Sequence, residues 1–219
     1  MGNDLLIVLG QLPAIGAGFL NTLILVAVAA CGSLLVGGGL TPLLMSPRKG
    51  VSRMVGAYCE VMRCIPFLLF VYLLYFGLPS LGLRMSNWTT GLLALVVYNS
   101  AYMALLLQGV WKDLPRENIE AARAFGYHGY ALVRRIIMPP VLMRAIPLMG
   151  NQLIQIVKDS AFLTVIAVLE LTSVMNAIQS THFIPFAAFA TAVFLYWLLC
   201  LCIEVVTGLL TRYAQERRS

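Results

Sequence analysis

Long runs of mostly apolar residues constrain this chain more than any other feature. The five runs fall near residues 19–44, 60–83, 88–111, 145–170 and 185–211. Each is long enough to cross a bilayer as a helix, which takes roughly twenty apolar residues. Only 11% of the 219 residues are charged, whereas about a quarter are charged in a soluble domain. The sequence therefore predicts one all-α integral membrane domain, residues 1–219, with five transmembrane helices.

The basic residues are unevenly distributed between the connections. Twelve of the 15 Lys and Arg lie in 48–53, 112–144 and 212–218, which an alternation of five spans puts on one side of the membrane. Cytoplasmic connections retain Lys and Arg, so we expect the N-terminus outside and the C-terminus in the cytoplasm. The same bias accounts for the net charge of +6, and no nucleic-acid partner is expected. The N-terminus has no basic region typical of a cleaved signal peptide.

The polar block at 112–144 is unusual in so apolar a chain. Pro115 suits the first turn of a helix, and Gly126 suits a left-handed stop after it. A second short helix, Tyr130 to Met138, is expected to end at Pro139-Pro140, because proline cannot continue the hydrogen-bond ladder. The block is predicted to form a helix, a turn and a helix on the cytoplasmic side. An ordinary solvated loop is the alternative from composition alone.

The spacing within this block resembles the E-A-A-x3-G-x9-I-x-L-P loop of ABC importer permeases. The matching residues are Glu120, Ala121, Ala122, Gly126, Ile136 and Pro139. Met138 stands where that family usually has Leu. Residues 58–70, YCEVMRCIPFLLF, are similar to the E-V-F-R-G-T-P-L-L-V-Q stretch of permeases for polar amino acids, including histidine, arginine, glutamine and opines. The resemblance extends over nearly the whole chain.

The resemblance implies a type I ABC importer permease in a bacterial inner membrane, taking up a polar amino acid or a derivative. In such transporters the loop inserts as coupling helices into a cytoplasmic ATPase, and Ala121 and Ala122 offer it a surface without bulk. The expected partners are two ATPase subunits, a second permease that is identical or paralogous, an extracytoplasmic substrate-binding protein and membrane lipid. ATP and Mg would bind the ATPase, since this chain has no G-x4-G-K-[ST] loop and no expected cofactor or catalytic residue.

The fourth run is the least lipid-like, because polar residues recur between 151 and 164. Gln152, Gln155 and Asp159 are spaced i, i+3, i+7, which places them along one helix face. Such groups must face protein or a wet cavity, and they offer acceptors and donors to an amino acid zwitterion. The candidate substrate contacts are Asn99, Tyr102, Gln152, Gln155, Asp159 and Ser160. Alternatively, Lys158 and Asp159 pair with each other or with neighbouring helices.

Two departures from the family pattern lie on the third span. Leu105 stands where relatives often have Glu, and Gln108 where they have Arg. A non-identical second permease that holds most substrate contacts would explain the loss, and so would a more apolar substrate.

Two other classes of membrane protein are the alternatives. A self-sufficient channel or an ion-coupled secondary transporter would act without ATP and would leave the block at 112–144 without a purpose. A membrane-embedded enzyme would need an intramembrane His, Asp and Glu constellation of metal or acid–base type, and the sequence has none. No metal site is expected, because the five Cys form no C-x-x-C pair and no cluster with His at metal spacing.

Overall fold

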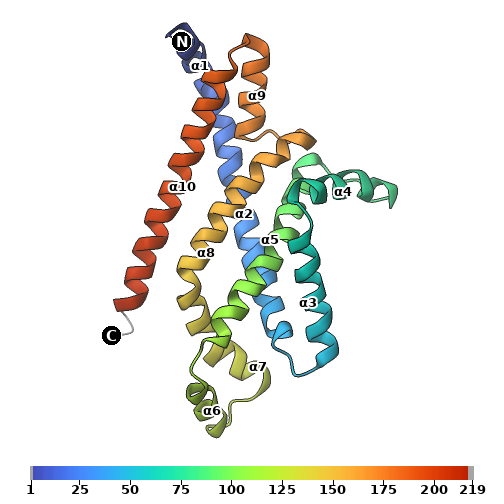
Figure 1. Cartoon of the computed structure of the whole chain (residues 1–219), viewed down its shortest axis with the longest axis vertical. Helices are drawn as coiled ribbons and strands as arrows, with labels where there is room; N and C mark the ends of the chain where they lie inside the picture. The colour runs from blue at the N-terminus through green and yellow to red at the C-terminus, as the bar shows by residue number, and fades with distance from the viewer. Residues whose placement is uncertain (1, 217–219) are drawn as a thin grey trace.

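A computed structural model describes residues 2–216, and every regular element in that range is a helix (Figure 1). The elements are α1 (Gly2–Gly10), α2 (Leu12–Leu44), α3 (Lys49–Cys64), α4 (Phe67–Ser80), α5 (Asn87–Lys112), α6 (Arg116–Ala124), α7 (Gly129–Leu132), the π-helix η1 (Val133–Ile137), α8 (Met138–Ser160), the 3-10 helix η2 (Ala161–Ile166), α9 (Leu171–His182) and α10 (Pro185–Glu216). The long helices run roughly side by side, and this confirms the all-α membrane class.

Three helices, α2, α5 and α10, are each long and apolar enough to cross a membrane. Two further crossings are possible where a bent pair of helices counts as one span. The pair α3 and α4 is bent by 106°, and the segment 129–166 is bent by 49° against α9. The third and fifth apolar runs match α5 and α10 closely, whereas α2 and α8 begin seven residues before the expected runs, at Leu12 and Met138.

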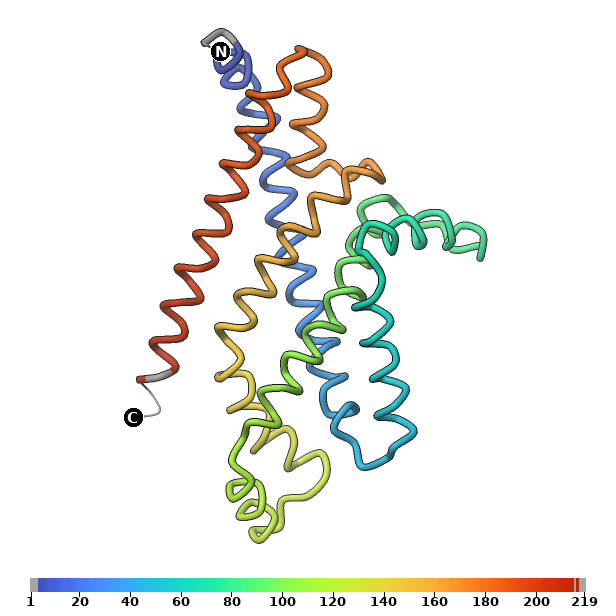
Figure 2. Tube along the Cα trace, in the orientation of Figure 1, coloured from blue at the N-terminus to red at the C-terminus, as the bar shows by residue number. Residues whose placement is uncertain are grey.

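The second expected span, 60–83, is wrong as a single helix. Ile65 is extended, with φ −93° and ψ 129°, and α4 then leaves α3 at 106° and projects sideways from the bundle (Figure 2). The cause is Pro66, because a proline disfavours the helical conformation in the residue before it. The first helix of this pair, α3, begins at Lys49, and its polar first half lies outside the expected run.

Small residues of the glycine-rich stretch 32–39 bring α2 close to α5. A Cβ on Gly37 would lie 2.8 Å from Met103 Cβ, and one on Gly32 would lie 2.8 Å from Val96 Cγ2. The Thr41 hydroxyl bonds the carbonyl of Gly37 on its own helix and also lies 3.4 Å from the Ala104 carbonyl of α5. The backbones of α2 and α5 therefore approach each other closely, and this pair forms the centre of the bundle.

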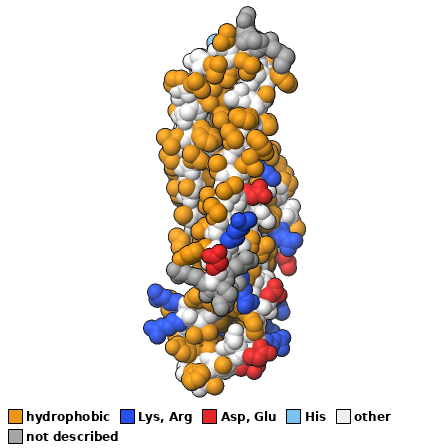
Figure 3. Space-filling view, turned by 90° about the vertical axis from the view of Figure 1, so that its left-hand side faces the viewer, with side chains coloured by type: hydrophobic (Ala, Val, Ile, Leu, Met, Phe, Trp, Pro, Cys, Tyr) orange, Lys and Arg blue, Asp and Glu red, His pale blue; other side chains and the backbone are white. Residues whose placement is uncertain are grey.

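The two ends of the bundle differ in character. The helix α1, the end of α9 and the start of α10 lie at one end, which we call the N-terminal end (Figure 1). Residues 113–137, which we call the elbow, lie at the other end, and α10 runs toward that end but stops short of it (Figure 1). On the face shown in Figure 3, charged side chains gather toward the elbow end, and hydrophobic side chains cover the other end.

Candidate functional site

A polar groove lies between α5 and α8 and has a volume of about 540 Å³. Its lining residues are Tyr98, Tyr102, Leu106, Leu148, Asn151, Gln152 and Gln155. The predicted polar face of the fourth run and the polar residues of the third run thus share one groove. A hollow of this size, with convergent amide and phenol groups, can hold a small polar molecule.

Four side chains form one hydrogen-bonded network at this groove. Gln152 Nε2 donates to Asn99 Oδ1 at 2.7 Å, and Asn99 Nδ2 donates to Asp159 Oδ2 at 3.3 Å. Gln155 Nε2 donates to Asp159 Oδ1 at 2.9 Å. Asn99 is fully buried and Asp159 is nearly so, whereas Gln152 and Gln155 reach the groove surface. The pairing of Asp159 with a neighbouring helix, left open by the sequence, is therefore with Asn99 of α5, and Gln155 adds a bond within α8.

The remaining two candidate contacts differ in position. Tyr102 lines the groove, and its hydroxyl lies 3.3 Å from that of Tyr98, one turn away. Ser160 is fully buried, and its hydroxyl donates to the Val157 carbonyl of its own helix at 2.8 Å. Sequence reasoning missed Tyr98, whose hydroxyl also donates to the Ile65 carbonyl at the α3–α4 break. The spacing of Tyr98 and Tyr102 by one helical turn was the available signal.

The first half of the elbow folds as a helix with a glycine cap. Gly126 has φ 85°, the left-handed conformation that its position predicts. Its N–H donates to the Arg123 carbonyl at 2.9 Å, and the N–H of Tyr127 donates to the Ala122 carbonyl at 3.0 Å. This pair of bonds is the Schellman arrangement, which uses up the last carbonyls of α6 and fixes the turn through the backbone.

The expected end of the second helix at Pro139-Pro140 is wrong. The chain runs on from α7 through the π-helix Val133–Ile137 directly into α8, whose first residues are Met138 and the two prolines. A proline inside a helix clashes with the carbonyl four residues before it, and the wider π turn moves that carbonyl aside. The elbow is thereby joined to α8 without a break.

The other motif residues of the elbow divide between surface and interior. Glu120, Ala121 and Pro139 are exposed, and Ile136 is half-buried. Ala122 is only 8% exposed and packs inward in an apolar cluster that the elbow shares with α5 and α8. The bulk-free surface expected of the Ala pair is therefore limited to Ala121.

Two exposed aromatic residues flank the glycine turn, and sequence reasoning missed them. Phe125 is 84% exposed and Tyr130 is 75% exposed. The Arg134 guanidinium lies 6.0 Å from the centre of the Tyr130 ring. Large exposed aromatic side chains on a polar segment are typical of protein–protein contacts. Their positions on either side of Gly126 indicate a contact surface only when the turn at Gly126 is known.

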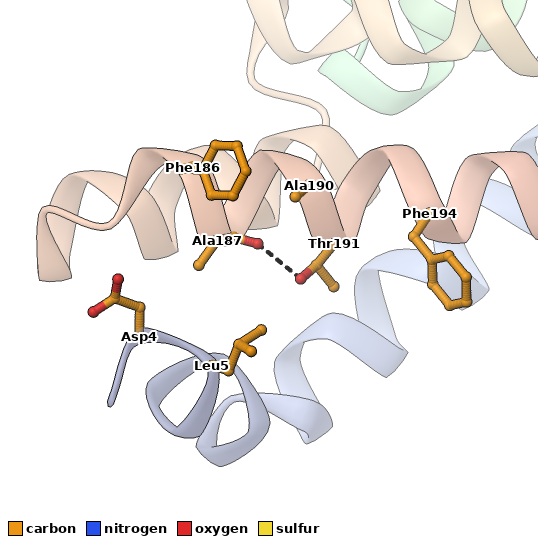
Figure 4. A pocket seen from close by; sticks show the side chains of 7 residues that line it. All are labelled: Asp4, Leu5, Phe186, Ala187, Ala190, Thr191 and Phe194. Atoms are coloured by element: carbon orange, nitrogen blue, oxygen red, sulfur yellow. Dashed lines mark hydrogen bonds between the residues drawn. The ribbon is translucent and has the colours of Figure 1, made fainter. Parts of the chain in front are cut away.

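A second hollow of the described residues is less polar than the groove. A hollow of about 250 Å³ between α1 and α10 is lined mostly by apolar groups, among them Leu5 and Phe186 (Figure 4). The hydroxyl of Thr191 there donates to the Ala187 carbonyl of its own helix at 2.8 Å. Within residues 2–216 no group of three or more His, Cys, Asp or Glu is placed to hold a metal ion. The groove is thus the better candidate for a polar ligand.

Sequence comparisons give one family and several relatives. The family model described as binding-protein-dependent transport system inner membrane component matches residues 31–214. The chain is 30% identical over 199 residues to the probable glutamine ABC transporter permease protein GlnM of Bacillus subtilis (strain 168), covering 91% of this chain and 92% of that protein. It is 27% identical over 203 residues to the nopaline transport system permease protein NocM of Agrobacterium fabrum, covering 88% of this chain and 84% of that protein.

Solved structures resemble the fold over almost its whole length. A crystal structure of an amino acid ABC transporter with histidines superposes with a TM-score of 0.85 at 28% identity, covering 94% of this chain and 96% of that chain. An inward-facing structure of the MetNI methionine ABC transporter gives a TM-score of 0.81 at 20% identity, covering 94% and 98%. The second likeness concerns the fold alone.

Proposed function

Since the chain belongs to the family of binding-protein-dependent transport system inner membrane components, and is a permease subunit of an ABC importer, we propose that it carries a polar amino acid or an amino acid derivative into the cytoplasm. The relatives named for glutamine and nopaline support this substrate class. ATP hydrolysis belongs to a partner chain, which binds ATP and Mg.

The observation that carries the proposal is the network Gln152–Asn99–Asp159–Gln155 at the groove between α5 and α8. Gln152 and Gln155 line the groove and supply amide oxygens for a substrate ammonium and amide N–H groups for a substrate carboxylate. Asp159 is buried behind them and holds Asn99 and Gln155 in place through its two carboxylate oxygens. Both glutamines reach the groove surface, so a bound zwitterion could form hydrogen bonds with their side chains while α8 stays helical. Buried polar groups in a membrane protein are costly and mark substrate pathways.

The elbow supports the second part of the mechanism, in which two ATPase subunits drive the transport. The elbow exposes a charged side chain and two aromatic rings that a cleft on an ATPase subunit could bind. The exposed residues are Glu120, Ala121, Phe125 and Tyr130. Because the elbow continues into α8 without a break, a displacement of the elbow passes directly to the helix that carries Gln155 and Asp159. Alternating access would follow from this linkage.

The complete transporter would contain further chains. We expect a second permease subunit, identical or paralogous, facing the groove, and a substrate-binding protein at the N-terminal end of the bundle. In this orientation the elbow and the C-terminus lie in the cytoplasm, as the clustering of Lys and Arg predicts.

Uptake into proteoliposomes tests the proposal. The permease, its ATPase and its binding protein are reconstituted with ATP enclosed, and uptake of labelled L-glutamine and L-arginine is measured. We expect uptake of at least one of them that requires both ATP and the binding protein. Accumulation by the permease alone, without ATP, would instead establish a channel or an ion-coupled transporter. ATP-dependent uptake restricted to compounds unrelated to amino acids would overturn the substrate class.

A further inference from the structure

A second buried polar cluster lies outside the groove, at the break between η2 and α9, and the transport proposal does not use it. Glu170 is fully buried, although it is a carboxylate in a membrane protein. Its Oε1 accepts the N–H of Ser173 at 2.7 Å, and its Oε2 accepts the N–H of Thr172 at 2.8 Å. Glu170 therefore caps the first turn of α9 with both oxygens.

The same carboxylate also reaches α10. The Tyr196 hydroxyl donates to Glu170 Oε2 at 2.7 Å, and the Thr172 hydroxyl lies 3.0 Å from that of Tyr196. Capping alone would need only a Ser, Thr, Asp or Asn at this position. The longer Glu side chain satisfies the cap and the link to α10 together, so a cap is not its whole role.

Two further bonds tie the same break to α2. The Thr22 hydroxyl accepts the N–H of Leu171 at 3.0 Å, and Asn21 Nδ2 donates to the Leu169 carbonyl at 2.9 Å. Glu170, Thr172, Tyr196, Thr22 and Asn21 are called the α9 node below. The node holds residues 169–172 against two of the long helices, α2 and α10.

The α9 node follows α8 in the chain, at the end opposite to the elbow. The helix α8 begins at the elbow, and its other end, Ser160, lies ten residues before Glu170. Between them η2 packs into the main core, with Leu163 Cδ1 only 3.0 Å from where a Cβ on Gly91 of α5 would lie. One end of α8 is thus joined to the part that an ATPase would move, and the segment that follows its other end is tied to α2 and α10 by the node.

We propose that Glu170 is a positioning residue that anchors the far end of the α8–α9 span to α2 and α10. With that end fixed, movement of the elbow changes the angle of α8 against α5 and so opens or closes the groove. With it released, the whole span shifts with the elbow and the groove keeps its shape, although ATP is still hydrolysed. This inference rests on the proposed import function and assigns Glu170 no contact with the substrate.

The test measures molecules imported per ATP hydrolysed in the reconstituted complex. The probe is whichever of L-glutamine and L-arginine the wild-type complex accumulates. For Glu170→Gln we expect this ratio to fall about tenfold, the effect of losing one hydrogen bond to a charged group. Tyr196→Phe keeps the cap of α9 and removes only the link to α10, so its ratio should fall in the same direction even if Glu170→Gln fails to fold.

A matched control separates anchoring from general destabilisation. Thr191→Val removes an α10 hydroxyl that bonds only within its own helix in the described structure, and the ratio should not change. If Glu170 had only a structural role, its substitution would lower the yield of complex. Import and ATP hydrolysis would then fall by the same factor, and their ratio would not change. A wild-type ratio in both Glu170→Gln and Tyr196→Phe would overturn the proposal.

A distance measurement makes the inference testable apart from the import function. Spin labels at Ala177→Cys on α9 and Val193→Cys on α10, with the native cysteines replaced, report the separation of the two helices. In the otherwise wild-type chain this distance should stay constant between the nucleotide-free and ATP-bound complex, and in Tyr196→Phe it should vary. If the wild-type complex imports nothing, the proposed function is wrong. The distances between α9 and α10 then still test whether Glu170 and Tyr196 hold the two helices together. Equal behaviour of both chains would refute it.

Discussion

The groove between α5 and α8 keeps its polar side chains bonded to one another, whereas the elbow holds its shape through backbone bonds and turns its large side chains outward. In the groove, Asn99 and Asp159 are buried and their partners lie on two different helices. In the elbow, Gly126 and the α6 carbonyls fix the turn, and Phe125 is 84% exposed. A segment built in the first way selects a ligand, and one built in the second way offers itself to another protein.

The largest effect is expected at the glycine turn of the elbow. Gly126→Pro replaces φ 85° by a residue confined to about −65° and removes the N–H that bonds Arg123. Strain of about 1–3 kcal/mol falls on the elbow alone, so the bundle should still insert while ATP-dependent uptake is lost. Uptake into proteoliposomes and the yield of inserted protein measure the two results.

A matched substitution tests the special role of that turn. Gly109→Ala changes a helical glycine of α5 that faces open space, so it should keep both insertion and uptake. Normal uptake by Gly126→Pro at normal expression would contradict the assignment of the elbow as the joint to the ATPase.

The next effect concerns the centre of the groove. Asp159→Asn keeps the size of the side chain but replaces one acceptor oxygen by an NH₂ group, so either Asn99 or Gln155 loses its acceptor. We expect the affinity of the purified complex for its amino acid to fall about tenfold, by calorimetry. Asp113→Asn makes the same chemical change at an exposed site at the end of α5 and should leave the affinity unchanged. Equal affinities in all three proteins would remove Asp159 from the binding site.

A smaller effect is expected from the aromatic surface of the elbow. Phe125→Ala and Tyr130→Ala should leave the fold intact, because both side chains are largely exposed. Each should weaken binding of the ATPase subunit by about 1 kcal/mol, or roughly fivefold, as for an ordinary interface residue. The measurement is a titration of the ATPase onto the permease in detergent. Phe186→Ala, 72% exposed at the opposite end, is the control, and an equal loss there would mean that the aromatic groups act nonspecifically.

The local part of this architecture could be predicted from the sequence. Hydropathy located the bundle because lipid demands long apolar runs, and the spacing of Gly126 indicated a left-handed turn that depends only on neighbouring residues. Periodicity placed Gln152, Gln155 and Asp159 on one face for the same reason. The elbow residues of the importer motif and the third and fifth spans were within reach of such reasoning.

The rest depends on contacts between distant segments. Proline has opposite effects at two places in the chain. At Pro66 the helix α3 is broken, whereas at Pro139 the helical path continues from the elbow into α8. In the second case a π turn precedes the proline, and Ile137 of that turn packs in the apolar cluster that the elbow shares with α5 and α8. Likewise, the node at Glu170 joins residues that lie far apart in the chain, and no local pattern marks them as neighbours.

The smallest effect is expected at Ser160, which the sequence places beside Asp159 among the candidate substrate contacts. Its hydroxyl is turned back to the Val157 carbonyl and is fully buried, so it offers the groove neither a donor nor an acceptor. Ser160→Ala removes a bond that contributes about 1 kcal/mol to folding at most, and the folded complex should import at nearly the wild-type rate. Gln155→Ala, one turn away on the groove surface, should reduce import in the same assay. A loss at Ser160 as large as that at Gln155 would show that the groove extends to the end of α8 during transport.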